Sequence, residues 1–186
     1  MNEQVDEFEF FLEKIWSDGF PVVTPTEERI ARILGATKRD PEEVIGPIPP
    51  AMETATVRDV AVHALMAGCR PEYLPVVIGA VELMLRDEFN VNGVQGTMHG
   101  VAPMMIVSGP YAAEIGIHGG NGCMGPGFRA NATIGRAIRL ILTNLGAGIP
   151  GVSSMTIFGM PSRYTYCLAE NMEDSPWTSL AVSKGY

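Results

Sequence analysis

Residues 119–145 read GGNGCMGPGFRANATIGRAIRLILTNL, a glycine-rich loop that runs directly into a helical pattern. The loop has five glycines in nine positions, and apolar residues then recur at helical spacing from Phe128 to Leu145, before Gly146. Glycines let a backbone bend tightly and approach other groups closely. We therefore predict an α/β fold, a single domain in which apolar helices pack short buried strands and this loop precedes a long helix.

Further elements are expected on both sides of this stretch. Helices are predicted over residues 1–16, 24–34 (with Thr24 as the cap), 57–67, 71–85 and 111–115. The segment 71–85 is apolar almost all round, as in a central helix. Strands are predicted near residues 93–98, 103–108 and 164–168. Prolines interrupt residues 37–55, which predicts an extended connector.

These elements suggest three regions. Residues 1–55 would hold N-terminal helices and a proline-rich wrapping connector, residues 56–169 the α/β core, and residues 170–186 a C-terminal interaction tail. The charged fraction is 18%, below the roughly 25% of ordinary soluble domains. We therefore expect much of the chain to lie in the interior or in an interface.

The net charge of -8 argues against nucleic acid and membrane surfaces as partners, because both require basic residues. Three scattered cysteines, an acidic N-terminus and the lack of a long apolar run predict a cytoplasmic protein. The charge is unevenly spread, since residues 115–169 contain four arginines and no acidic residue. A small anion therefore remains a plausible ligand for this segment.

The glycine-rich loop is the predicted binding site for that anion. Its N–H groups and the positive end of the following helix would attract a carboxylate or a phosphate. The candidate binding residues are Gly120, Asn121, Gly122, Arg129, Asn131 and Arg136. Two alternatives stay open: the glycines could serve only close packing, and the arginines could form a solvated stripe.

The dinucleotide-binding spacing G-x-G-x-x-G is present at Gly120, Gly122 and Gly125. It lacks the acidic residue about 20 positions later that binds the ribose, and the Lys-Ser/Thr end of a phosphate-binding loop is also missing. We therefore expect no nicotinamide or nucleotide cofactor.

Cys123 is the predicted nucleophile, because a thiol before a helix and near Arg129 favours the thiolate. His99 and His118 are candidate general bases, since both lie in predicted loops. Together the three residues could alternatively bind a divalent metal, although no diagnostic ligand spacing is present. Cys123 could also be a small packed residue. Cys69 is a second nucleophile candidate, but its place at the end of a helix disfavours the thiolate, and we expect it to be structural. Cys167 is expected to lie in the core, and His63 to be a packed or surface histidine.

The segments 67–77, 101–103 and 125–136 resemble the bacterial UGSC-type (seleno)protein-associated family, and the likeness runs from about residue 16 to residue 177. In such proteins the UGSC motif holds a redox-active selenocysteine or cysteine. This sequence contains no such motif. The resemblance implies that the chain is the N-terminal part of a longer protein, or a split subunit whose redox centre lies on another chain.

The predicted function is a subunit of a hetero-oligomeric cytoplasmic enzyme that binds a small anionic substrate and uses thiol-dependent redox or C–S chemistry. A second protein subunit, further copies of the chain, or both would be its partners. One alternative is a metal-dependent lyase or hydrolase with His and Cys ligands. The other is a non-catalytic binding or scaffold subunit.

Overall fold

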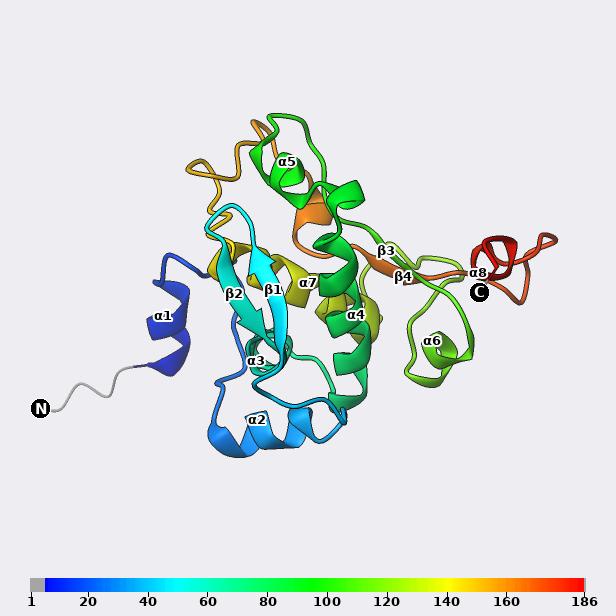
Figure 1. The fold of residues 1–186 in the computed structure, drawn as a ribbon, viewed down its shortest axis with the longest axis horizontal. Helices are drawn as coiled ribbons and strands as arrows, with labels where there is room; N and C mark the ends of the chain where they lie inside the picture. Colours follow the sequence, from blue (N-terminus) through cyan, green and yellow to red (C-terminus); the bar gives the residue numbers. More distant parts are fainter. Residues whose placement is uncertain (1–5, 186) are drawn as a thin grey trace, which may run out of the picture.

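Helix α7 (Arg129–Asn144) is the longest element and the centre of the fold (Figure 1). The computed structural model describes residues 6–185. The remaining elements, in chain order, are α1 (Glu7–Leu12), α2 (Glu27–Leu34), β1 (Val44–Ile48), β2 (Glu53–Thr56), α3 (Val57–Met66), η1 (Pro71–Tyr73), α4 (Leu74–Met84), η2 (Asp87–Phe89), α5 (Val91–Gly96), β3 (Met105–Val107), α6 (Pro110–Glu114), η3 (Pro161–Arg163), β4 (Cys167–Ala169) and α8 (Leu180–Ser183).

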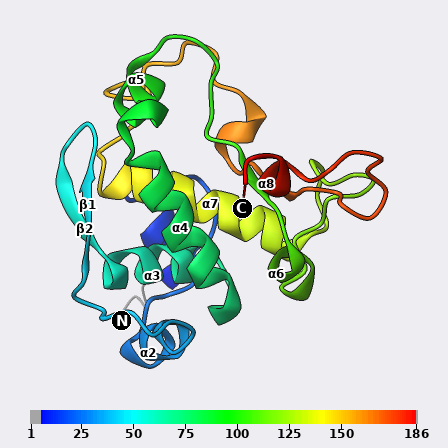
Figure 2. The same cartoon turned by 45° about the vertical axis from the view of Figure 1, so that its right-hand side comes forward.

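The core forms where α7 packs against α3, α4 and β4, and α2 covers the far side of α3. In Figure 2 α7 crosses behind α4, with α3 below it. Ten residues of α7 are buried, among them Ile134 and Leu140, which are fully enclosed. The structure thus confirms the predicted α/β class and long helix. It places α7, and not the predicted 71–85 segment, at the centre.

Helix α3 begins where the sequence predicted. The Thr56 hydroxyl accepts a hydrogen bond from the Asp59 N–H at 3.2 Å, and an Asp59 carboxylate oxygen accepts one from the Thr56 N–H at 2.8 Å. This reciprocal pair satisfies two N–H groups that the helix itself leaves free. Helix α2 begins later than expected, because Thr26 caps it and not Thr24.

The predicted connector over residues 37–55 contains a β-hairpin, so that prediction was wrong in part. Strands β1 and β2 pair antiparallel, with Pro47 opposite Thr54, and Ile48 is buried in the core. A proline cannot donate to a strand ladder, but it is tolerated in an edge strand such as β1. For this reason the prolines concealed the hairpin from the sequence pattern.

The strand predicted near residues 93–98 is also wrong, because residues 91–96 form helix α5. The Asn90 side chain accepts a hydrogen bond from the Gly93 N–H at 3.2 Å and so caps the helix. Val91 and Gln95, four residues apart, are the buried residues of α5. Their spacing is helical, but a segment this short does not distinguish a helix from a strand.

We call residues 104–128 and 165–185 the arm, because they extend away from the helical body (Figure 1). Its centre is the parallel pair β3 and β4, which confirms two of the predicted strands. β4 is buried, whereas Ile106 in the middle of β3 is 45% exposed. The N-terminal helix α1 is shorter than predicted, and residues 1–5 of that prediction lie outside the described range.

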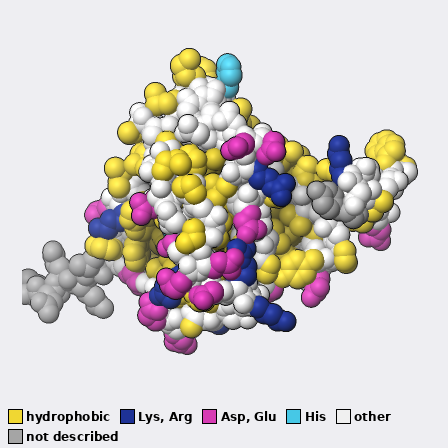
Figure 3. All heavy atoms as spheres, viewed as in Figure 1, with side chains coloured by type: hydrophobic (Ala, Val, Ile, Leu, Met, Phe, Trp, Pro, Cys, Tyr) yellow, Lys and Arg dark blue, Asp and Glu magenta, His cyan; other side chains and the backbone are white. Residues whose placement is uncertain are grey.

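Charged side chains gather over the lower part of the body, where α2 lies (Figure 3). Apolar side chains are prominent over the upper part, near α5, and over the arm. No helix within residues 6–185 has both the length and the apolar character needed to cross a membrane.

Candidate functional site

Asn131, a buried residue in the first turn of α7, holds the glycine-rich loop in place through hydrogen bonds. Its side-chain amide accepts a hydrogen bond from the His118 N–H at 2.8 Å and donates to the carbonyl oxygens of His118 at 2.9 Å and Cys123 at 3.2 Å. One predicted binding residue is therefore fully engaged with the backbone of the loop. Its contacts are those of a structural clamp.

Close packing explains part of the glycine content. A Cβ on Gly119 would clash with the backbone of Ala169, which lies at the end of β4. Gly122 and Gly127 have positive φ angles, at which other residues are strained. These three positions favour the interpretation that the glycines are needed for close packing and for the backbone conformation of the loop. Gly120 and Asn121 contact the His118 imidazole, as described next.

Cys123 and His118 lie in the same loop, and His99 does not. The His118 ring stacks on Phe128 at 3.9 Å and donates from Nε2 to the carbonyl oxygen of Asn121 at 3.0 Å. An added Cβ on Gly120 would touch the same ring. Cys123 is half-buried.

His99 instead is exposed in the segment after α5, where its carbonyl oxygen accepts a hydrogen bond from Thr156 at 2.8 Å. Across residues 6–185 no group of three or more His, Cys, Asp or Glu side chains is placed to hold a metal. The predicted divalent-metal site at His99, His118 and Cys123 stays a prediction.

The other two cysteines are both inside the protein. Cys69 and Cys167 are both buried, and burial raises the pKa of each thiol to about 12. A thiol with such a pKa stays protonated and unreactive at neutral pH. His63 is buried in α3, and burial lowers its pKa.

Both predicted anion-binding arginines have partners within the chain. Arg129 donates to the carbonyl oxygen of Gly68 at 2.9 and 3.2 Å. Arg136 forms a bidentate ion pair with Asp18 at 2.6 and 2.9 Å, and both side chains are largely buried. The carboxylate that Arg136 binds therefore belongs to the N-terminal segment of the same chain.

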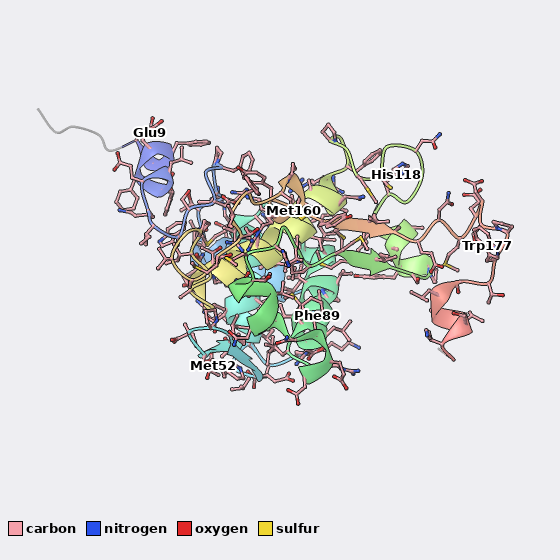
Figure 4. All side chains as sticks on the ribbon, turned by 90° about the horizontal axis from the view of Figure 1, so that it is seen from above. Glu9, Met52, Phe89, His118, Met160 and Trp177 are labelled. Atoms are coloured by element: carbon pink, nitrogen blue, oxygen red, sulfur yellow. The ribbon has the colours of Figure 1, made fainter. Side chains whose placement is uncertain are left out.

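A cleft of about 660 Å³ lies elsewhere, between the second half of α7 and residues 150–164. Arg139 and Thr143 of α7 line one side, and Arg163 of η3 lines the other. Ten residues separate Arg129 from Arg139, which corresponds to about 15 Å along the helix. Figure 4 likewise shows His118 well apart from Met160, another residue of the cleft.

Arg139 and Arg163 converge on one acceptor in this cleft. The side-chain oxygen of Gln95 lies 3.4 Å from Arg139 Nη1 and 3.5 Å from Arg163 Nη2, so the two nitrogens are no more than about 7 Å apart. Arg139 also donates to the Gly148 carbonyl oxygen at 2.6 Å, and Arg163 to the Ser154 hydroxyl. Every one of these partners is neutral.

Neither arginine is ion-paired to any residue in the range 6–185. Asp18 is the one acidic residue among the described residues that line the cleft, and Arg136 already binds it. Burial lowers the pKa of Arg163, and burial together with the Arg163 charge lowers the pKa of Arg139 to about 10. Both groups nevertheless carry a full positive charge at neutral pH.

Three buried hydrogen-bond donors of this cluster have no partner among residues 6–185. They are Arg163 Nη1, Gln95 Nε2 and the Ser162 hydroxyl. Ser162 lines a small cavity of about 20 Å³ behind the cleft, and both arginines line that cavity as well. Buried polar groups in folded proteins nearly always have partners. The cluster therefore lacks acceptors and negative charge.

Arg139, Arg163 and Gln95 are not among the anion-binding residues predicted from the sequence. A signal was present, because four arginines and no acidic residue occur in residues 115–169. Arginines without nearby carboxylates need a distant partner or a ligand. Only the folded chain shows that Arg136 has found Asp18, and that Arg139 and Arg163 have no such partner within the described residues.

No family model, curated protein or solved structure matches this chain. The resemblance to the UGSC-type family therefore stays a prediction. Functional inference depends on the geometry of the chain itself.

Proposed function

We propose that the protein binds a small oxyanion, a carboxylate or a phosphate, in the cleft between α7 and residues 150–164. The observation that carries this proposal is the pair of guanidinium groups of Arg139 and Arg163, which line the cleft without an ion-pair partner among the described residues. Arg163 Nη1, Gln95 Nε2 and the Ser162 hydroxyl are buried beside them without acceptors in that range, although Gln95 and Ser162 do not line the cleft itself.

An oxyanion fits this cluster in both charge and geometry. Guanidinium groups bind carboxylates and phosphates through parallel N–H···O bonds, and such charge-assisted bonds are among the strongest in proteins. Two arginines within about 7 Å of each other repel, and a negative group between them would convert that repulsion into attraction.

The cleft favours ligand binding over catalysis. Its lining in the described part of the chain contains no cysteine or histidine, and its hydroxyl groups come from Ser17, Ser154, Thr143, Thr156 and Tyr164. Without an adjacent base these hydroxyls are weak nucleophiles. Of the functions predicted from the sequence, the binding subunit is therefore the one that this cleft supports best.

The test is a calorimetric titration of the protein with acetate and with inorganic phosphate in a buffer free of other small anions. We expect at least one of them to bind, and Arg163→Gln and Arg139→Gln to weaken it about ten- to a hundredfold, because each removes hydrogen bonds to a charged group. Arg86→Gln, at an exposed position, is the matched control. Equal affinity in all four proteins would reject the proposal.

Thiol chemistry at Cys123 is the second candidate function, in a hetero-oligomeric enzyme as predicted from the sequence. The observation in its favour is that Cys123 is half-buried while Cys69 and Cys167 are buried. Its test is the pH dependence of alkylation by iodoacetamide, with and without His118→Asn. A Cys123 that reacts no faster than a free thiol at pH 7, with or without His118, would reject this candidate.

A further inference from the structure

Resting on the oxyanion site proposed above, we infer that its ligand is an amphipathic acid, whose apolar body lies against the side chains of Ile157, Phe158, Met160 and Tyr164. We call these four side chains the rim. The inference concerns the part of the ligand that does not touch the arginines. It names a chemical class that the charged cluster alone does not specify.

The rim presents apolar side chains to solvent beside the cleft. Phe158 is 97% exposed and Ile157 67% exposed, although both line the cleft. Met160 and Tyr164 continue the same lining and are also exposed. Because the Phe158 ring is almost entirely in contact with water, its burial contributes almost nothing to the stability of the fold. Covering it by an apolar group is favourable in proportion to the area removed from water.

The cleft has few charged lining residues. Its charged lining residues among those described are Arg139, Arg163 and the Asp18 carboxylate that Arg136 neutralises. Residues 156–161 contribute no charge. A ligand that fits both parts needs a negative group for the arginines and an uncharged apolar body for the rim.

The volume of the cleft supports a body of this kind. About 660 Å³ falls in the range of roughly 300–1,000 Å³ that binds drug-sized molecules. Acetate or phosphate would occupy a small part of it and would leave the rim exposed to water. An acid with a longer apolar chain would fill more of this volume and could cover the rim.

The experiment measures the affinity of the whole chain for acetate, butanoate, hexanoate and octanoate in one buffer. These probes share a carboxylate and differ only in methylene groups. With about half the surface of each methylene buried, affinity should rise about twofold per group, or about sixty-fold over the six groups from acetate to octanoate. Octanamide, which has no charge, should bind far more weakly than octanoate.

A pair of variants separates the rim from the charged cluster. Phe158→Ser should reduce the gain from acetate to octanoate at least threefold and leave acetate affinity unchanged. Val152→Ser is the matched control, because Val152 is 71% exposed in the same 150–164 stretch of chain but does not line the cleft. Both side chains are too exposed for their loss to unfold the protein.

The outcomes distinguish this inference from the proposed function. Equal binding of all four acids, lost in Arg163→Gln, would overturn the amphipathic ligand and leave the oxyanion site intact. A rise with chain length that Arg163→Gln does not affect would overturn both. Concentration-dependent dimerisation that Phe158→Ser abolishes, without dependence on chain length, would show that a second copy covers the rim and would overturn the inference.

Discussion

Neutralising Arg163 should stabilise the free protein, which is an unusual expectation for a buried, hydrogen-bonded side chain. In Arg163→Met the long stem is retained and the charge is removed. The variant therefore relieves the repulsion with Arg139 without leaving a large cavity.

The structure sets the size of the effect. Two unit charges no more than about 7 Å apart repel by about 2.4 kcal/mol or more at an effective dielectric constant of about 20. Against this gain, the variant loses the hydrogen bond to Ser154, which contributes about 1 to 1.5 kcal/mol. It also loses the long 3.5 Å contact with Gln95, whose oxygen keeps Arg139 as a donor, so this second loss is small. We expect a net increase of about 1 kcal/mol in the free energy of unfolding, or about 2 to 4 °C in melting temperature.

Urea unfolding at pH 7.5 and low ionic strength would measure this difference. Repeating the titration with added phosphate or acetate gives the second readout. The wild-type protein should be stabilised by the anion it binds, because that anion binds only the folded state. Arg163→Met should lose this response.

The control is Arg163→Lys, which keeps the positive charge and so should not be stabilised. If Arg163→Met instead lost about 2 kcal/mol or more, the guanidinium would be a structural group satisfied by its present partners. That result would refute the reasoning for a missing anion.

Three further predictions concern the residues around the candidate sites. Arg136→Ala should lower the free energy of unfolding by about 3 to 5 kcal/mol in urea titrations, because it leaves the buried Asp18 carboxylate unpaired. A loss below about 1 kcal/mol would show that Arg136 is not paired with Asp18 in the folded protein. Gly148→Ala should lower the melting temperature by several degrees, because its Cβ would overlap the buried Gln95 amide, whereas Gly96→Ala, with open space around it, should not. Mass spectrometry after brief iodoacetamide treatment of the native protein should find Cys123 alkylated and the other two cysteines unmodified; equal labelling of all three would contradict their burial.

Predictions from the sequence succeeded where local signals were strong. The apolar spacing from Phe128 to Leu145 gave α7 to within a residue at each end, and Thr56 gave the start of α3. They failed where two local structures share one pattern. Residues 93–98 alternate weakly between apolar and polar, and tertiary contacts at Val91 and Gln95 make them helical.

The candidate site was harder to predict than the fold. The dense glycines and Asn131 predicted an anion site in the glycine-rich loop. In the structure Asn131 binds the backbone of that loop, and Gly119 allows its close approach to Ala169. The cleft residues Arg139 and Arg163 are 24 positions apart, and nothing in their local sequence links them. Gln95, which both approach, comes from a segment predicted to be a strand.

The sequence by itself determined the class of the fold, its longest helix and a segment of four arginines that lacks any carboxylate. It could not determine which arginine obtains a partner, because Asp18 is 118 positions from Arg136 and their pairing depends on how the N-terminal segment crosses α7. The tertiary structure decided this. Packing around α7 satisfies Arg129 and Arg136 and brings Arg139 and Arg163 together without an ion-pair partner among the described residues, which is why we propose an anion as the ligand of the cleft.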